Sequence, residues 1–580
     1  MNNDKIKYWD VDSILVDLCV VGGGMAGLCA ALAAARNGLQ VVLVQDRPVL
    51  GGNASSEIRM WICGAHGSDN KEGGILEEIL LDNLYYNPNL NFTIWDHVLY
   101  GKCLEEKNLK VLLNCSVQDV VMENNRIVAV RAWHLTRQCG VEINALLFAD
   151  CSGDSILRKS GAEVRWGRES RAEFGESHAP EYPDRKTMGN SILIQLREVD
   201  QHFPFIAPCW AYTYTEADLP HRQLTPTGNN FWWLEVGGVK DTIADADTIR
   251  DELIRMAYGV WALIKNHPDG RGHRWELDWI GSLPGKRENV RYVGDHILTQ
   301  NDVEAEGRFE DRVAYGGWSM DDHHPEAIKY PGEPTIFHPA PVPYGIPYRC
   351  LYSRNVANLF FAGRNISATH MAMSSTRVMA SCALMGQAVG TAAAIAVQKG
   401  LMPRGVYEKC MPELQSTLIN QDSYQPWCSR RIPEPCQSAG LIASIGDAEV
   451  LRNGVERDLA GADNGWWGCA GDKVTYTWND PVPVRVVRLV LDSDFTLNKR
   501  MLCCYPKDQK PVAMPAMLAR DFEIEFCDVT GKWTTAVVIR DNRRRLVVIP
   551  LTVAGVTGCR LCITRSWGGA RSHIFAFDCH

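Results

Sequence analysis

A glycine-rich turn near the N-terminus places the strongest constraint on how this chain folds. Gly22, Gly24 and Gly27 form the pattern G-x-G-x-x-G within the stretch VVGGGMAG. A short apolar run, residues 14–21, precedes them, and a segment rich in Ala and Leu, residues 25–37, follows them. Strand, glycine turn and helix in this order are the context that a dinucleotide-binding fingerprint requires. The turn therefore predicts a Rossmann-like α/β domain.

Each glycine of this turn has its own physical role. Gly22 permits the tight turn, Gly24 lets the backbone approach a pyrophosphate, and Gly27 lets the helix pack closely on the strand. The N-terminus of the helix offers unpaired N–H groups and a partial positive charge to the phosphates. The helix is expected to end at Gly38, a good residue for a helix C-terminus. The fingerprint alone does not distinguish FAD from NAD.

A second strand, expected at residues 39–44, carries the next signal. Dinucleotide folds usually place an acidic residue at its end, where it binds the ribose hydroxyls. Here Gln45 stands at that position and Asp46 follows it. A glutamine side chain can both accept and donate hydrogen bonds to hydroxyl groups. The two residues are therefore retained as cofactor-binding candidates.

Length and composition limit the class of protein. A chain of 580 residues is expected to form two to four structural units. Its 46% hydrophobic and 22% charged residues are typical of a globular protein, and the net charge of -9 argues against nucleic acid as the main partner. The N-terminal residues lack the apolar core of a secretory signal, and no run of 18 apolar residues predicts a membrane span. We expect a cytoplasmic protein with no membrane partner.

The twenty cysteines give little support to a metal site or a disulfide framework. The chain holds one C-x-x-C motif, residues 559–562, in a strand-like stretch where residues three apart point to opposite faces. The C-terminal Cys579 and His580 could complete a zinc site, an alternative that the sequence leaves open. The closest other pair is Cys503 and Cys504, which are adjacent. We expect mostly reduced thiols and no metal.

A second glycine turn, Leu50-Gly51-Gly52-Asn53, follows about 30 residues after the first. The first turn, the strand ending VQDR and LGGN together resemble the FAD-binding half of glutathione-reductase-like flavoproteins. The continuation NASSE and the stretch GAHG at residues 64–67 are similar to the FAD-dependent oxidoreductase family of bacterial carbohydrate-degrading gene clusters. This resemblance implies FAD as the cofactor, with Gly51, Gly52 and Asn53 on its flavin side.

Two later segments extend the resemblance. The stretch DCSGD, residues 150–154, resembles the segment with which such flavoproteins return to the first sheet. A strand ending in Gly363 and Arg364 resembles the segment that closes the FAD site, although many relatives have an acidic residue where Arg364 stands. Ser374 and Ser375 are expected to cap the long helix that follows. The predicted cofactor-binding residues are Gly22, Gly24, Gly27, Gln45, Asp46, Gly51, Gly52, Asn53, Gly153, Asp154, Gly363 and Arg364.

The domain organisation follows from the order of these segments. The last 140 residues hold six short strand candidates with turns between them, which is typical of a β-sandwich. Their end, WGGARSHIFAFDCH, is similar to galactose-binding-like modules, which bind sugars or act as structural caps. The predicted domains are an FAD-binding domain at 1–164 and 346–400, an inserted α+β substrate domain at 165–345, a connecting segment at 401–440 and a β-sandwich at 441–580.

The predicted reaction is the oxidation of a hydroxyl-bearing carbon by hydride transfer to the flavin, with a sugar or glycoside as substrate. No second glycine fingerprint predicts a built-in NAD(P)H domain, so the electrons would leave to oxygen or to a separate acceptor. His370 is the first candidate for the base, because its pKa is ordinarily near neutral and it lies between the closing strand and the long helix. His66 is the second. Candidate substrate-binding residues are Arg59, Arg287, His323 and Arg377.

Two other classes of function remain open at this point. The FAD segments also resemble those of heterodisulfide-reductase-like subunits, which would make the chain an electron carrier. Such subunits carry grouped cysteine motifs, for which the single motif at 559–562 is a poor substitute. A carbohydrate-binding protein with a vestigial flavin domain is the third possibility, and the intact cofactor segments argue against it.

Overall fold

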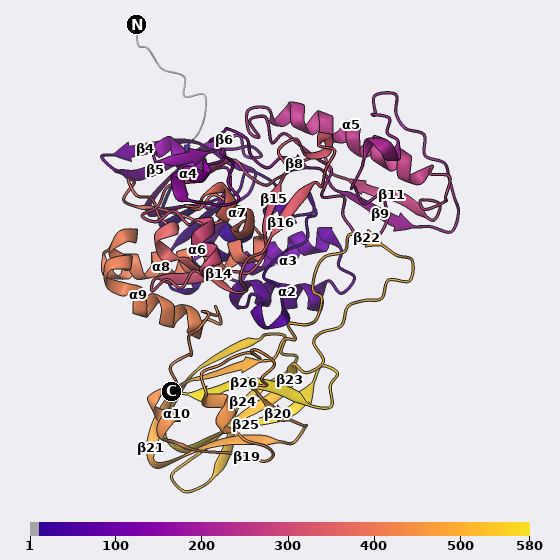
Figure 1. Cartoon of the computed structure of the whole chain (residues 1–580). Coiled ribbons are helices and arrows are strands. Elements are labelled where there is room, and N and C mark those ends of the chain that lie inside the picture. Colours follow the sequence, from indigo (N-terminus) through magenta and orange to yellow (C-terminus); the bar gives the residue numbers. More distant parts are fainter. Residues whose placement is uncertain (1–10) are drawn as a thin grey trace. The chain divides into compact units, whose positions relative to one another are not determined.

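The computed structural model describes residues 11–580, which form two compact units (Figure 1). The first unit holds residues 11–66, 91–415 and 500–510, and the second holds residues 67–90, 416–499 and 511–580. These boundaries differ from the predicted domains, and the predicted connecting segment, 401–440, is divided between the two units. Residues 67–90 were expected in the FAD-binding domain but belong to the second unit, whereas residues 500–510 return to the first.

The first unit is built around a sheet of seven strands, whose core order is β3-β2-β1-β6. These four strands run parallel, and the short β18 pairs in parallel with the carboxyl end of β6. The hairpin β4–β5 turns at Asn124 and Asn125, and β5 pairs antiparallel with the first half of β6. The prediction of a Rossmann-like sheet is confirmed. The strands are β1 (Val11–Val21), β2 (Val41–Val44), β3 (Leu109–Leu112), β4 (Cys115–Glu123), β5 (Arg126–His134), β6 (Cys139–Asp150) and β18 (Leu359–Phe361).

Helices α1 (Met25–Arg36) and α8 (Met379–Lys399) pack together at unusually short range. A Cβ added at Gly386 would lie 2.0 Å from the carbonyl oxygen of Ala26, and one at Gly390 would lie 2.1 Å from that of Ala30. The small residues of both helices therefore permit this contact. Helix α8 is long and apolar enough to cross a membrane by composition, but 94% of its apolar window is buried in the protein. A core helix passes the same test.

The start of α8 differs from the prediction. Ser374 and Ser375 were expected to cap a long helix, but both lie inside a separate helix, α7 (His370–Thr376). Thr369 caps α7, since its hydroxyl accepts the backbone N–H of Ala372. Ser374 instead donates its hydroxyl to the carbonyl of Met371, one turn back. Serine is a common cap residue, but here tertiary contacts of the buried segment decide its position.

The region between β6 and β18 folds into several small sheets and helices. Its largest helix, α5 (Ala246–Lys265), packs on a sheet in the order β11-β9-β22 around a core that includes Trp233 and Trp261. Strand β22 comes from residues 500–510 and pairs in parallel with β9. The elements of this region are β7 (Val164–Trp166), α4 (Arg171–Phe174), β8 (Asn190–Ser191), β9 (Ile194–Glu198), β10 (Glu235–Val236), β11 (Trp275–Ile280), β12 (Gly285–Lys286), β13 (Val290–Tyr292), α6 (Gln300–Glu304), β14 (Arg312–Gly316), β15 (Met320–His323), β16 (Thr335–His338), β17 (Tyr344–Pro347) and β22 (Cys504–Tyr505).

The second unit is an antiparallel β-sandwich, as predicted, although its strands are longer than expected. Two predicted strand pairs merge into β21 and β25, which bend where the pairing register shifts. One half of β21 pairs with β19 and the other half with β26. The strands are β19 (Gly440–Ala443), β20 (Trp466–Gly468), β21 (Lys473–Leu491), β23 (Ala519–Cys527), β24 (Trp533–Ile539), β25 (Leu546–Ser566) and β26 (Ser572–Cys579).

The remaining helices lie outside these sheets. Helix α3 (Phe92–Leu104) belongs to the first unit, and α2 (Gly74–Tyr86) and α10 (Glu434–Ser438) belong to the second. The boundary between the two units, at residues 415 and 416, falls within helix α9 (Pro403–Asn420).

All twenty cysteines lie in the described part of the chain, and each is a free thiol. In the C-x-x-C motif, Cys559 faces the core of the sandwich, whereas the Sγ of Cys562 lies 3.4 Å from a carboxylate oxygen of Glu525. The two thiols therefore point apart, as the period of a strand requires.

Candidate active site

The carboxyl ends of β1, β2, β6 and β18 meet at one cavity in the first unit. Ligands of open α/β sheets bind at this edge. Eleven of the twelve residues predicted to bind the cofactor line the cavity, although they come from four separate stretches of chain. These residues are Gly22, Gly24, Gln45, Asp46, Gly51, Gly52, Asn53, Gly153, Asp154, Gly363 and Arg364.

The glycines of the first turn differ in what surrounds them. A Cβ added at Gly27, the residue that does not line the cavity, would lie 1.8 Å from the carbonyl oxygen of Gly22. At Gly24 the nearest atom to an added Cβ is the Cα of Gly52, at 3.9 Å. Gly27 is therefore required by packing inside the protein, whereas Gly24 faces open space in the cavity. Gly24 is also the N-cap of α1, which has no side-chain cap, so its first N–H groups remain available to an anion.

Gln45 stabilises the glycine turn from the neighbouring strand. Its Oε1 accepts the backbone N–H of Gly23 at 2.7 Å, and its Nε2 donates to the carbonyl of Val49 at 3.3 Å. Both polar ends of the side chain are thus bonded to backbone. Asp46, the other ribose candidate, is half exposed at the cavity.

Asp154 lies between two cations at the cavity wall. Its carboxylate contacts Lys286 Nζ at 2.6 Å and Arg364 NH2 at 2.7 Å, and Arg364 Nε donates to the carbonyl of Gly153 at 3.0 Å. Burial alone would raise the pKa of Asp154, but the charges of Arg364 and Lys286 outweigh it and hold the pKa below its usual value. Arg364, which replaces the acidic residue of many relatives, therefore pairs with an acid of the preceding segment.

A second polar group borders the same cavity from the inserted region. Arg287, which lines the cavity, donates to the hydroxyl of Ser191 at 2.7 Å and to the carbonyl of Trp232 at 2.9 Å. Its guanidinium also lies 3.3 Å from a carboxylate oxygen of Glu235. Burial lowers the pKa of Arg287, and the charge of Glu235 partly offsets that shift.

His323 connects Arg287 to a second cavity-lining arginine, Arg377. Its Nδ1 lies 2.6 Å from Glu235, its Nε2 lies 3.3 Å from Asp321, and Asp321 accepts from Arg377 NH2 at 3.1 Å. We call these five residues the His323 network. Burial would raise the pKa of both carboxyl groups, but neighbouring charges lower it. At Asp321 these charges belong to His323 and Arg377. At Glu235 they belong to Arg287 and His323. Both carboxylates are therefore ionised beside His323.

His370 lies in a different network, none of whose members lines the cavity. Its Nδ1 lies 2.9 Å from Glu288 and its Nε2 lies 3.1 Å from Asp322. Arg291 pairs with Glu288 and, at 2.9 Å, with Glu169. We call these five residues the His370 network. All but Asp322 have side chains that are no more than 3% exposed.

This environment is unfavourable for the predicted role of His370 as a base. Burial would lower its pKa, but the charges of Glu288 and Asp322 reverse the shift and raise the pKa to about 10. At neutral pH the imidazole therefore already carries a second proton and has no lone pair for another. The position of His370 along the chain was a reasonable basis for the prediction, but Glu288 and Asp322 come from distant segments.

The remaining two candidates do not line this cavity. His66 is exposed, and its ring stacks on Trp318 with centroids 4.5 Å apart. Arg59 lies over the ring of Trp279 at 4.4 Å and donates to the carbonyl of Ser56 at 3.1 Å. The cavity also includes Ser191 and Lys286, which are not among the residues predicted from the sequence. Lys286 stands next to the predicted Arg287 in the stretch LPGKRE, and this position could have identified it from the sequence.

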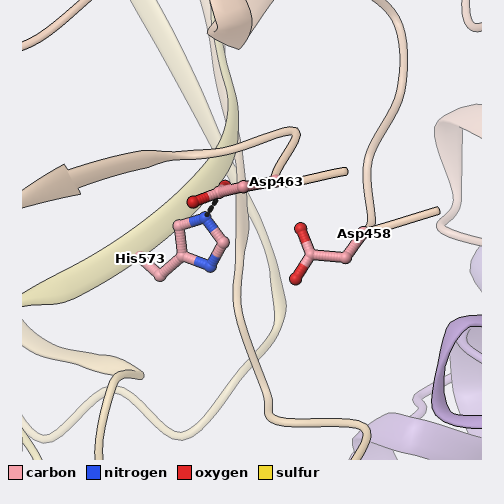
Figure 2. A group of neighbouring side chains, drawn as sticks. All are labelled: Asp458, Asp463 and His573. Atoms are coloured by element: carbon pink, nitrogen blue, oxygen red, sulfur yellow. Dashed lines mark hydrogen bonds and ion pairs between the residues drawn. The ribbon is translucent and has the colours of Figure 1, made fainter. Parts of the chain in front are cut away.

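In the second unit, Asp458, Asp463 and His573 form a group of side chains of the kinds that bind metals, shown in Figure 2. The His573 Nε2 is hydrogen-bonded to Asp463 at 3.0 Å, and its Nδ1 is hydrogen-bonded to Asp492 at 2.8 Å. The ring also stacks on Trp467, at 4.1 Å between centroids. Hydrogen bonding therefore accounts for both nitrogens of this imidazole.

The residues of the cavity in the first unit fit a dinucleotide. Arg47 NH1 and Arg377 Nε line it as buried donors that have no hydrogen-bond partner among the described residues. The open space at Gly24 and the Arg47 donor suit the phosphate oxygens of a flavin dinucleotide. The fold and site define a flavoprotein of the oxidoreductase class.

The comparisons with known proteins agree with this assignment. A model of the family described as FAD dependent oxidoreductase matches residues 17–418. The chain belongs to this family, and its cofactor is FAD. The resemblance stated from the three sequence segments is therefore confirmed.

Individual relatives are distant. Thiamine thiazole synthase of Thermotoga maritima is 27% identical over 141 residues, which are 23% of this chain and 54% of that protein. The chain thus matches about half the length of this curated relative. A geranylgeranyl bacteriochlorophyll reductase-like protein of Thermoplasma acidophilum is 13% identical, with 70% of this chain and 86% of the other covered and a TM-score of 0.32. A family 32 carbohydrate-binding module of Streptococcus pneumoniae EndoD is 17% identical, with 25% and 95% covered and a TM-score of 0.19.

Proposed function

We propose that this oxidoreductase oxidises a hydroxyl-bearing carbon of a sugar or glycoside. One observation carries the proposal: the His323 network presents two arginines, from separate elements, to the cavity that holds the cofactor. FAD, when bound, supplies the hydride acceptor for such a reaction. The contribution of the protein is to bind the substrate oxygen and to stabilise the negative charge that develops on it.

Two guanidinium groups suit an oxygen that is losing its proton. Removal of the hydroxyl proton leaves negative charge on the oxygen, and preorganised cations stabilise that charge most strongly in a site that excludes water. Arg287 is held in place by Ser191 and the backbone of Trp232. Arg377 has a buried Nε donor without a partner among the described residues, and this donor is available to a substrate oxygen.

The acids behind the two arginines keep them oriented. Glu235 and Asp321 contact Arg287 and Arg377 respectively, and His323 lies between these two acids. The two ring nitrogens of His323 thus connect the two carboxylates. We assign His323 as a positioning residue, because it acts on the substrate through the arginines. A sugar suits the pair of donors because it offers several neighbouring hydroxyl oxygens.

The test is reduction of the bound flavin by substrate. The holoprotein is mixed without oxygen with a panel of monosaccharides, glycosides and sugar acids, and flavin absorbance is followed. We expect at least one hydroxyl compound to bleach the flavin and its deoxy analogue to leave it oxidised. Admission of oxygen then shows whether oxygen is the acceptor. If dithionite bleaches the flavin but no member of the panel does, the proposal is wrong.

A further inference from the structure

We propose that Cys503 and Cys504 form a peroxide-reactive dithiol, which closes to a disulfide between adjacent residues. The two sulfur atoms lie 4.0 Å apart at the start of β22. The site belongs to the inserted region of the first unit, where β22 pairs with β9. Neither cysteine lines the cofactor cavity, so this inference is independent of the proposed function.

The two thiols differ in access and in ionisation. Cys503 is half-buried, so a small reagent can reach it, whereas Cys504 is 8% exposed. The hydrogen bond from Cys504 lowers the pKa of Cys503, and the backbone N–H groups of Cys503, Gly228 and Cys504 lower it further against the effect of burial. The hydrogen bond and burial raise the pKa of Cys504. Cys503 is therefore the attacking thiolate, and Cys504 holds the proton.

The oxidant is a hydroperoxide, and the atoms balance in two steps. The Cys503 thiolate attacks one peroxide oxygen, so that an S–O bond forms, the O–O bond breaks and hydroxide leaves. The sulfur of Cys504 then attacks the sulfenic acid of Cys503, so that the S–S bond forms, the S–O bond breaks and water is released. Two thiols lose two electrons and two hydrogens, and hydrogen peroxide is reduced to two molecules of water.

A disulfide at this position is expected to be reversible. Adjacent Cα atoms lie about 3.8 Å apart across a trans peptide, which is less than the roughly 4.4–6.8 Å of ordinary disulfides. The bond is therefore strained, and strained disulfides have higher potentials and are reduced more readily. Residue 504 also pairs with Leu196 of β9, so ring closure would strain the short ladder of β22.

A second pair of cysteines in the chain provides an internal comparison. The sulfur atoms of Cys559 and Cys579 lie 3.0 Å apart in the core of the sandwich, and both residues are completely buried. Burial raises the pKa of Cys579. If proximity alone decided reactivity, this pair would oxidise first. Access and thiolate character instead favour Cys503 and Cys504.

The holoprotein is treated with limiting hydrogen peroxide, alkylated, digested and examined by mass spectrometry. We expect the peptide with Cys503 and Cys504 to lose two hydrogens about tenfold faster than the exposed Cys209 and Cys469 are oxidised. Dithiothreitol should restore the two thiols of this peptide. Cys559 and Cys579 should remain reduced in the folded protein.

Two variants test the order of events. In Cys504→Ser the sulfenic acid of Cys503 has no resolving thiol, so dimedone should label it, whereas Cys503→Ser should show no label at position 504. The inference is overturned if Cys209, Cys469 or the buried pair oxidises before Cys503 and Cys504 in the unmodified protein. It is also overturned if dimedone fails to label Cys503 in the Cys504→Ser variant. The first measurement needs no variant, so it holds even where a substitution impairs folding.

Discussion

The His323 network and the His370 network contain the same kinds of side chain but have different consequences. Each places a histidine between two carboxylates and adds arginine. The His323 network ends in Arg287 and Arg377 at the cofactor cavity, whereas no member of the His370 network reaches that cavity. Charges that border a cavity can act on a ligand, while charges that satisfy one another inside the protein act on stability. Chemical identity alone does not separate the two cases.

The largest expected effect comes from breaking the closed network. His370→Leu removes the cation between Glu288 and Asp322 and should lower the free energy of unfolding by about 3–5 kcal/mol, because both carboxylates lose a charged partner inside the protein. Denaturant unfolding measures this change. His324→Leu is the matched control, because that ring is half-buried and stacks on Tyr330. A stable His370→Leu protein that has lost flavin reduction would contradict the comparison.

Breaking the open network should affect the reaction more than stability. In Arg377→Met, the donor at the cavity is lost, so the rate of flavin reduction by substrate should fall by about 100-fold. Arg131→Met is the control, since Arg131 forms an exposed ion pair with Glu142. FAD content is measured separately. Unchanged reduction in Arg377→Met, with FAD bound normally, would remove this arginine from the proposed mechanism.

The glycine turn offers a smaller version of the same contrast. In Gly24→Ala the new methyl group enters the open cavity, so FAD affinity should fall by about tenfold, or about 1.4 kcal/mol, while the apoprotein keeps its stability. Gly27→Ala is the opposite case, because its methyl group would clash with the backbone of Gly22 and destabilise the fold itself. Flavin fluorescence and thermal unfolding distinguish the two. Equal FAD affinity in Gly24→Ala and the unmodified protein would show that the cofactor does not approach this residue.

The pH dependence of stability tests the protonation of His370. Its folded pKa is about 10, above the reference value of 6.5, so the folded state holds a proton that the unfolded state has lost between these values. The stabilisation is therefore complete below pH 6.5 and is lost as the pH rises through about 10, by up to about 1.4 kcal/mol per pH unit. Compared with the unmodified protein, His370→Gln should lose stability less steeply between pH 7 and pH 10. Parallel curves for the two proteins would mean that His370 is neutral.

Much of the fold was predictable because it depends on neighbouring residues. Strand β1, the glycine turn and α1 are set by backbone sterics and apolar periodicity over some twenty-five residues. The hairpin of β4 and β5 follows from Asn124 and Asn125 in the same way. The merged strands β21 and β25 were not predictable, because their breaks look like turns and only cross-strand pairing shows that each strand continues.

In the candidate site too, residues in local motifs were predictable, whereas contacts between distant residues were not. Gly24 and Gly153 were selected from local motifs, and the fold brings both to one cavity. His370 was selected because it follows a strand and a turn, yet Glu288 and Asp322 lie 82 and 48 residues away from it. No local pattern contains those partners. The expectation that Ser374 caps a helix was wrong for a similar reason, because burial outweighed the local preference of serine for a helix N-terminus.

The sequence by itself therefore determined the class of fold, the FAD-binding segments and the family, because short-range backbone geometry limits which residues can form them. Only the tertiary structure decided which histidine is enclosed, which arginines face the cavity and which cysteines are accessible. The physical reason is that the pKa and the reactivity of a side chain depend on charges and burial supplied by residues far away in the chain. Those contacts exist only after folding.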